Sequence, residues 1–196
     1  GGSLGGILSY EYACTKADRL AGLVSVSGTK IAPCLPNATI PTMQIHSLAD
    51  EAVAYDGGFT STEWLLGLNF PAVVPTMQTW AASNGECPEG ASETEQTVTP
   101  IASATIWDCG GTITRLETLS TGGHGWPVIG DYIVADHLLD FLLGPDLCAP
   151  GFFSATGEEP CVPAPAGTFV DTEGATEAIA CDLGSYQDEA GQTSCK

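Results

Sequence analysis

Apolar runs of strand length alternate with segments of helical spacing from the N-terminus to about Leu147. The pattern predicts strands at residues 20–27, 40–46, 96–98, 104–108 and 113–119. It predicts helices at residues 5–18, 60–69, 74–83 and 132–143, and a polar loop at 85–95. Such alternation is typical of a parallel sheet covered by helices. We therefore expect an α/β fold with a mostly parallel sheet, whose strands supply about half of a complete α/β domain.

The pattern changes after Leu147, where long apolar runs end and prolines, glycines and acidic residues become frequent. We therefore predict an α/β domain at residues 1–147 and a small cysteine-rich segment at 148–196. Within this segment, residues 164–178 and 181–195 repeat each other in their glycines, aromatic residues and aspartates.

The two copies of this repeat differ at their first and last positions. The second copy has Cys181 and Cys195 there, and the first copy has Ala164 and Ala178. Because both cysteines are missing together, we predict a disulfide between Cys181 and Cys195. A unit of this size cannot build a core, so a disulfide would supply the missing stability.

The chain contains an even number of cysteines, at positions 14, 34, 87, 109, 148, 161, 181 and 195. None forms a CxxC pair or a Cys/His cluster with zinc spacing, so we predict disulfides, an extracellular location, no metal and no cofactor. Cys14 with Cys34, and Cys148 with Cys161, are further possible pairs. Spacing alone leaves their connectivity open.

The formal net charge is −19, with only 5 lysines and arginines. Such a field repels nucleic acid and anionic lipid, so we expect neither as a partner. An acidic, solvated surface that keeps a secreted protein soluble accounts for the same charge. No apolar run approaches the roughly 20 residues of a membrane-spanning helix, so no membrane span is expected.

The first six residues read Gly-Gly-Ser-Leu-Gly-Gly, and Gly1-x-Ser3-x-Gly5 has the pattern of a nucleophile elbow. The pattern alone is weak, because 24 of the 196 residues are glycine. It nominates Ser3 as a nucleophile and the backbone N–H of Leu4 as an oxyanion donor. Because an elbow follows a strand, we expect the domain to be truncated at its N-terminus. Loss of a second oxyanion donor would then leave this fragment strongly impaired.

A serine nucleophile needs a base to take its proton and an acid to orient that base. Asp50 and His124 follow Ser3 in the chain order of α/β-hydrolases, and each comes just after a predicted strand. The carboxyl ends of parallel strands meet at one edge of a sheet, which is where ligand-binding loops lie. The sequence therefore predicts a Ser3–Asp50–His124 triad.

Other polar and aromatic residues near these positions favour structural roles. His46 is expected to bond the loop that carries the acid, His137 to lie on the surface of a helix, and Asp56 to form the turn before Gly57. For Trp126, stacking on a substrate and simple loop packing both remain open.

The segments GGSLGG, HSLADEAVAYDGG, WDCGG and GGHGWP resemble the polyhydroxybutyrate-depolymerase-type esterases, a group that includes feruloyl esterases. The resemblance spans about residues 1–145. It implies an α/β-hydrolase fold in which Ser3 is the nucleophile, Asp50 the acid and His124 the base. It also implies a Cys87–Cys109 disulfide. The implied substrate is a neutral ester, either a hydroxyalkanoate polyester or a phenolic ester on a polysaccharide.

The C-terminal segment resembles the ephrin-receptor-like cysteine-rich repeats of extracellular proteins over about 36 residues. This resemblance implies an extracellular binding partner and a segment that is truncated at its C-terminus. Two other functions remain open. One is a non-catalytic extracellular binding or adhesion module with a degenerate hydrolase half, and the other is a serine peptidase of the same fold.

Overall fold

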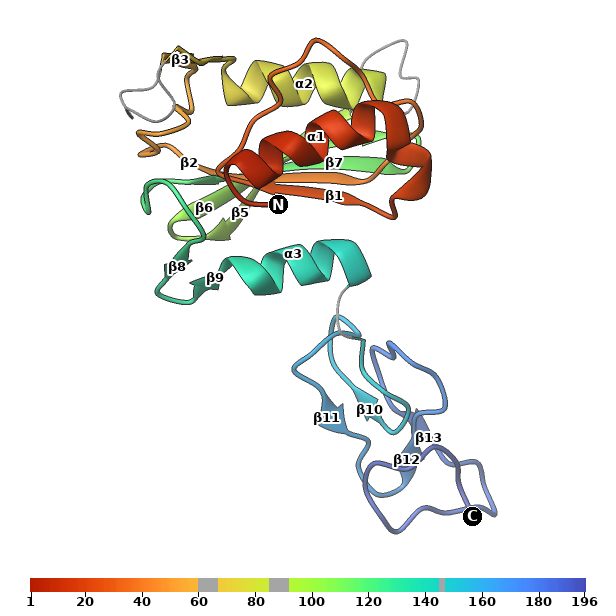
Figure 1. The fold of residues 1–196 in the computed structure, drawn as a ribbon. Helices are drawn as coiled ribbons and strands as arrows, with labels where there is room; N and C mark the ends of the chain where they lie inside the picture. Colours follow the sequence, from red (N-terminus) through yellow and green to blue (C-terminus); the bar gives the residue numbers. More distant parts are fainter. Residues whose placement is uncertain (60–66, 85–91, 145–146) are drawn as a thin grey trace. The chain divides into compact units, whose positions relative to one another are not determined.

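The computed structural model describes residues 1–59, 67–84, 92–144 and 147–196, which form two compact units, Gly1–Leu142 and Leu143–Lys196. The predicted boundary after Leu147 falls inside the second unit. In the first unit, a five-stranded sheet has two helices on one face and one on the other (Figure 1). The helices are α1 (Leu4–Lys16), α2 (Val73–Ser83) and α3 (Val134–Leu143). The strands are β1 (Leu23–Val26), β2 (Thr42–Ser47), β5 (Ser92–Thr99), β6 (Ala102–Cys109) and β7 (Thr112–Leu119).

Short elements complete this unit, namely η1 (Ala17–Arg19), β3 (Gly58–Phe59), β4 (Asn69–Phe70), β8 (Val128–Ile129) and β9 (Tyr132–Ile133). The helix predicted at 132–143 thus begins only after a two-residue strand. Most of the helix predicted at 60–69 lies outside the described residues. No helix in the described ranges has both the length and the apolar character needed to cross a membrane.

The sheet is mixed, so the prediction of a mostly parallel sheet is wrong for one half of it. Its strand order is β1-β2-β7-β6-β5, with parallel pairs from β1 to β7 and antiparallel pairs from β7 to β5. The physical reason is the two-residue link Gly110–Gly111, because parallel neighbours need a crossover of a dozen or more residues. Both glycines have positive φ, as tight hairpins require. The predicted polar loop also ends early, because residues 92–95 belong to β5.

Strand β1 is buried on both faces, as expected for a continuous apolar run in a parallel sheet. Under α1 and α2, Tyr10 and Trp80 pack edge to face with ring centroids 5.0 Å apart. The opposite face packs under α3 around Val26 and Ile45. The parallel strands are thus packed between two apolar layers.

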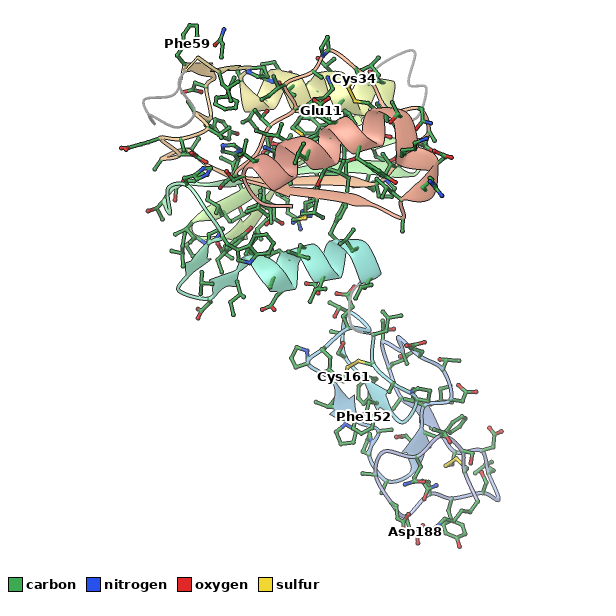
Figure 2. All side chains as sticks on the ribbon, in the orientation of Figure 1. Glu11, Cys34, Phe59, Phe152, Cys161 and Asp188 are labelled. Atoms are coloured by element: carbon green, nitrogen blue, oxygen red, sulfur yellow. A yellow bond between two sulfur atoms is a disulfide. The ribbon has the colours of Figure 1, made fainter. Side chains whose placement is uncertain are left out.

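Disulfides fasten both units. Cys14 on α1 is joined to Cys34 in the loop after β1. Cys34 is labelled in Figure 2. In the second unit Cys148 is joined to Cys161 and Cys181 to Cys195. These three pairs are among those nominated from the sequence. Cys109 is also disulfide-bonded, and its proposed partner Cys87 lies outside the described residues.

The second unit contains three stacked copies of the repeat, and the first of them, which contains Cys148 and Cys161, adds to the two copies predicted at residues 164–178 and 181–195. Its short strands are β10 (Phe152–Phe153), β11 (Val162–Pro163), β12 (Thr168–Phe169) and β13 (Ile179–Ala180). The N–H of Gly174 donates to Cys148 O at 2.8 Å, and one copy later the N–H of Gly191 donates to Ala164 O at 2.8 Å. These equivalent bonds make Cys148 the counterpart of Ala164.

This alignment makes the Cys148–Cys161 disulfide the counterpart of Cys181–Cys195. The middle copy has Ala164 and Ala178 in place of the cysteines, and Ala164 is fully buried as Cys148 is. The disulfide in the flanking copies joins Cα atoms 5.6 and 5.8 Å apart. From this equivalence we expect the alanine pair to accept a further disulfide of the same kind.

We predict that the double variant Ala164→Cys/Ala178→Cys forms this disulfide under oxidising conditions. Closing a loop of this length stabilises a fold by about 3 kcal/mol. Thiol titration under denaturing conditions checks bond formation, and slower hydrogen exchange at Gly174 and Gly191 checks stabilisation. Ala164→Ser/Ala178→Ser is the size-matched control without a cross-link. Free thiols in the oxidised double variant would show that the copies are not equivalent.

Candidate active site

Ser3 stands at a strained junction just before α1, with φ 52° and ψ −123°. Only two non-glycine residues in the described ranges have positive φ, and Ser3 is one of them. Its N–H donates to Val26 O at 2.8 Å, and Val26 N–H donates to Gly1 O at 2.9 Å. These bonds to β1 hold the backbone that presents the Ser3 hydroxyl. The strain is that of a sharp strand-to-helix turn.

Close packing around this turn requires glycine at Gly6 rather than at Gly5. A Cβ on Gly6 would overlap Ser25 Oγ, and a Cβ on Gly1 would lie 2.5 Å from the carbonyl of Gly5. A Cβ on Gly5 would meet nothing within 4 Å. The second glycine of the elbow pattern, Gly5, is therefore not needed for space in this structure.

Asp50 lies in the loop after β2, and its side chain is fully buried. Its Oδ1 accepts the backbone N–H groups of Ala52 and Val53 at 2.9 and 2.8 Å. Burial by itself would raise the pKa of Asp50, but hydrogen bonds from His46, Val53 and His124 outweigh it and lower the pKa to about 2. Asp50 is therefore a charged acceptor at neutral pH.

His124 connects the other two residues through its two ring nitrogens. Its Nδ1 lies 2.9 Å from Asp50 Oδ2 and 3.0 Å from Oδ1, and its Nε2 lies 2.9 Å from Ser3 Oγ. An ionised carboxylate can only accept, so Nδ1 carries the hydrogen and Nε2 accepts the Ser3 hydroxyl. The structure thus brings together all three residues of the triad that the sequence nominated.

The order of strands explains this convergence. In β1, β2 and β7 the chain runs in the same direction, with Val26 opposite Ile45 and Ser47 opposite Leu119. Their carboxyl ends therefore open onto one edge of the sheet. Asp50 follows β2 there, and His124 follows β7.

A series of hydrogen-bonded, buried side chains leads from α1 through β2 to Asp50. Tyr10 donates its hydroxyl to Gln44 Oε1 at 2.8 Å, and Gln44 Nε2 donates to His46 Nδ1 at 2.9 Å. His46 Nε2 is then left to donate to Val53 O at 2.8 Å, and it lies 3.3 Å from Asp50 Oδ2. The expectation that His46 bonds the loop carrying the acid is confirmed. Asp56, also as expected, lies in the turn closed by Gly57 N–H and Ala54 O.

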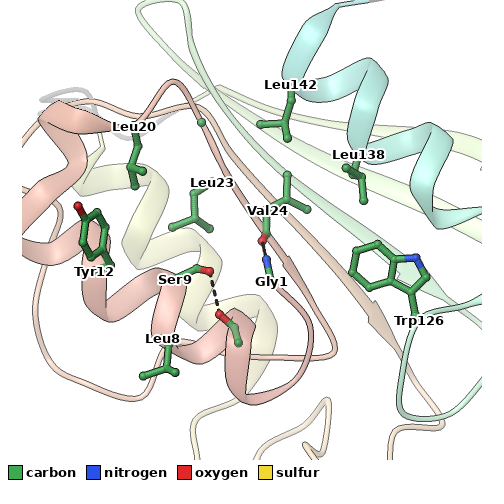
Figure 3. Close-up of a pocket in the computed structure, with 12 residues that line it drawn as sticks. Gly1, Leu8, Ser9, Tyr12, Leu20, Leu23, Val24, Trp126, Leu138 and Leu142 are labelled. Carbon is green, nitrogen blue, oxygen red and sulfur yellow. Dashed lines mark hydrogen bonds between the residues drawn. The ribbon is translucent and has the colours of Figure 1, made fainter.

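Trp126 is half-exposed and lies beside Gly2. With α1, the edge of β1 and α3 it lines an apolar groove of about 550 Å³ (Figure 3). Leu8 and Tyr12 come from α1, and Leu138 and Leu142 from α3. Ser3, Asp50 and His124 are not among the lining residues, so this groove is distinct from the triad.

The structure corrects the expectation for His137, which is half-buried instead of lying freely on the surface. Its ring stacks on Tyr132 with centroids 4.1 Å apart, and its Nδ1 lies 3.2 Å from Glu117 Oε2. Glu117 is fully buried on β7 and also accepts hydrogen bonds from Arg115 and Tyr132. A buried carboxylate needs such donors, and this requirement draws His137 inward.

No cluster of three or more His, Cys, Asp or Glu side chains suited to a metal ion occurs in the described part of the chain. Comparisons with protein-family models, curated proteins and solved structures gave no match for this chain.

Three residues that contact the site loops were not singled out by the sequence pattern. Gln44 bonds His46, Ser27 bonds Gly125, and Ser47 Oγ donates to Thr121 O at 3.1 Å. Ser27 and Ser47 could have been found from the sequence, because each is a polar residue at the carboxyl end of a predicted buried strand. Gln44 is harder to find in this way, because it is a polar residue in the interior of such a strand and not at its end.

We predict opposite effects for two neighbouring substitutions in α1. Gly5→Ala should raise the free energy of unfolding by up to about 1 kcal/mol, because alanine favours a helix and the site is open. Gly6→Ala should lower it by about 1–3 kcal/mol, because the new methyl group overlaps Ser25. Urea unfolding of both variants beside the wild type checks this, and equal effects would contradict the packing argument.

We also predict a pH dependence of stability that comes from Asp50. Its pKa is lowered on folding, so its contribution is complete above the unfolded value near 3.8 and is lost as pH falls through about 2. Between pH 5 and pH 2 the wild type should lose about 2 kcal/mol more than Asp50→Asn. Urea unfolding across this range is the measurement. Asp56→Asn, at the exposed turn, should follow the wild type, and a parallel loss in Asp50→Asn would refute the assignment.

Proposed function

We propose that this chain carries the catalytic triad of a serine carboxylic-ester hydrolase with an α/β-hydrolase fold. The observation that supports the proposal most is the imidazole of His124, which bonds Ser3 Oγ through one nitrogen and Asp50 through the other. The resemblance of the motif segments to polyhydroxybutyrate-depolymerase-type esterases supports the same reading, as does the strained backbone of Ser3.

The proposed reaction follows from these contacts. Ser3 Oγ attacks the ester carbonyl while its proton passes to His124 Nε2. Asp50 holds the Nδ1–H tautomer and stabilises the imidazolium that forms. The imidazolium then protonates the leaving alcohol, and water releases the acyl group from Ser3 by the same steps in reverse.

The tetrahedral oxyanion needs backbone donors. Leu4 is the first residue of α1, so its N–H is one of the helix donors that have no acceptor within the helix. It lies next to Ser3 in the chain, where an oxyanion hole is expected. If a second donor is lacking in this chain, hydrolysis should be slower by about 10²–10³.

A neutral, partly apolar ester fits the surroundings of the triad best. An exposed apolar side chain lies close in the chain to each member, since Leu4 follows Ser3, Leu48 precedes Asp50 and Trp126 follows His124. The net charge of −19 disfavours anionic substrates. We therefore propose a hydroxyalkanoate polyester or a phenolic ester on a polysaccharide as the substrate.

The disulfides in the structure are consistent with an oxidising compartment, and we propose that the protein is secreted. The cysteine-rich repeats are then candidates to bind an extracellular partner. The triad would act on amides by the same steps, which keeps a serine peptidase as the second candidate function.

We predict that a fluorophosphonate ester labels this chain at Ser3. A single covalent event is detectable even where turnover is slow, and peptide mass spectrometry locates the label. Ser3→Ala should abolish labelling and His124→Gln should slow it by a factor of about 10³ or more. Ser9→Ala, in the helix α1 that follows Ser3, is the matched control and should label at the wild-type rate.

Each outcome of this experiment has a definite meaning. Ser3-dependent release of p-nitrophenol from p-nitrophenyl acetate, without cleavage of peptide anilides, would support the esterase. Cleavage of anilides at a comparable rate would favour the peptidase. A folded chain whose Ser3 stays unlabelled would overturn the catalytic proposal and favour an extracellular binding module.

A further inference from the structure

Ser27, directly after β1, is the second non-glycine residue of the described ranges with positive φ, at 51°. This left-handed conformation is sterically unfavourable for a residue with a Cβ atom, whereas glycine adopts it without that cost. The Ser27 side chain is also buried, with only 3% of the residue exposed. A strained and buried serine at such a position indicates that its hydroxyl makes contacts that glycine could not.

The Ser27 hydroxyl bonds both backbone groups of one residue, Gly125. It donates to Gly125 O at 3.0 Å and accepts from Gly125 N at 3.2 Å. The backbone of Ser27 is itself fixed, because its N–H donates to Ile45 O on β2 at 2.9 Å. Gly125 is therefore tied to the sheet through a single side chain.

Gly125 directly follows His124, in a loop that is rich in glycine and therefore has many accessible backbone conformations when unfolded. Gly122, Gly123 and Gly125 all have positive φ, at 113°, 64° and 133°. Glycine has more conformations to lose than any other residue, so this loop pays a high entropic cost to stay in one shape. Anchors outside the loop are needed to hold the imidazole in place.

The same turn after β1 also touches the nucleophile. Val26 O accepts the N–H of Ser3 at 2.8 Å, and a Cβ on Gly28 would lie 2.6 Å from Ser3 O. Residues on either side of Ser27 thus contact the backbone of Ser3, while Ser27 contacts the loop of His124. The turn sets the separation between the hydroxyl and the imidazole.

We propose that Ser27 is a positioning residue of the triad, whose hydroxyl fixes Gly125 and thereby holds His124 between Ser3 and Asp50. This inference rests on the proposed function, because the position matters only if Ser3 reacts. Ser47 at the end of β2 supports it, since its hydroxyl bonds Thr121 O at the start of the same loop, at 3.1 Å. The two serines hold the loop on either side of His124.

The test compares the fluorophosphonate labelling rates of Ser27→Ala and Ser27→Gly with that of the wild type. Both variants lose the hydroxyl, but only Ser27→Gly also relieves the backbone strain and should remain as stable as the wild type. We expect both to label Ser3 about 10–100-fold more slowly, because small misplacements of a catalytic group have effects of this size. Hydrogen exchange at the Gly125 amide should become faster in both.

Ser120→Ala is the matched control, because Ser120 lies at the start of the same loop and its exposed hydroxyl bonds Ile101 O instead. It should label at the wild-type rate. The low-field NMR resonance of His124 Nδ1–H gives a readout that does not depend on reactivity. We expect it in the wild type and in Ser120→Ala, and we expect it to broaden or vanish in Ser27→Gly.

The outcomes separate this inference from the proposed function. A wild type that is not labelled, with a His124 resonance that is lost in Ser27→Gly, would refute the esterase and retain the positioning role. A Ser27→Gly variant with the wild-type resonance and the wild-type labelling rate would overturn the positioning role.

Discussion

The parallel pairing of β1, β2 and β7 is the constraint on which the candidate site depends. Strands that run in one direction end at the same edge, so loops from distant parts of the sequence meet there. β1 is buried on both faces, and its register places Val26 opposite Ile45 of β2. Val26, at the end of β1, then holds Ser3 through its backbone carbonyl, which accepts the Ser3 N–H.

The fold contains two buried carboxylates, one in the loop after β2 and one on β7. Each is compensated by hydrogen-bond donors and positively charged or polar side chains around it. Asp50 is stabilised by donors of its own loop and by two histidines. Glu117 is stabilised by Arg115, Tyr132 and His137. In both cases the donors come from several elements, so the charge can be buried only when the tertiary structure is complete. Asp50 faces the candidate site, whereas Glu117 ties α3 to the sheet.

The cysteine-rich unit separates the role of the disulfide from that of the backbone. Its middle copy lacks the cysteine pair, yet Ala164 O accepts the same hydrogen bond that Cys148 O accepts in the copy before it. Backbone hydrogen bonds between copies therefore define how the copies stack, and the disulfides stabilise this arrangement further. Ala164 is fully buried, and its backbone bonds Gly151 in the copy before it and Gly191 in the copy after it.

The sequence by itself determined the local features of this protein. The glycine-flanked Ser3, the order of Asp50 and His124 after apolar runs, and the Cys181–Cys195 pair could all be read from residue type and spacing, since they depend on neighbours in the chain. Tertiary structure decided the rest. The parallel pairing of β2 with β7, the contact of His137 with Glu117 and the contacts of Ser27 with Gly125 arise between segments far apart in sequence. The pattern of residues indicates which face of a helix or strand is buried, but it does not indicate which other element of the fold will pack against that face.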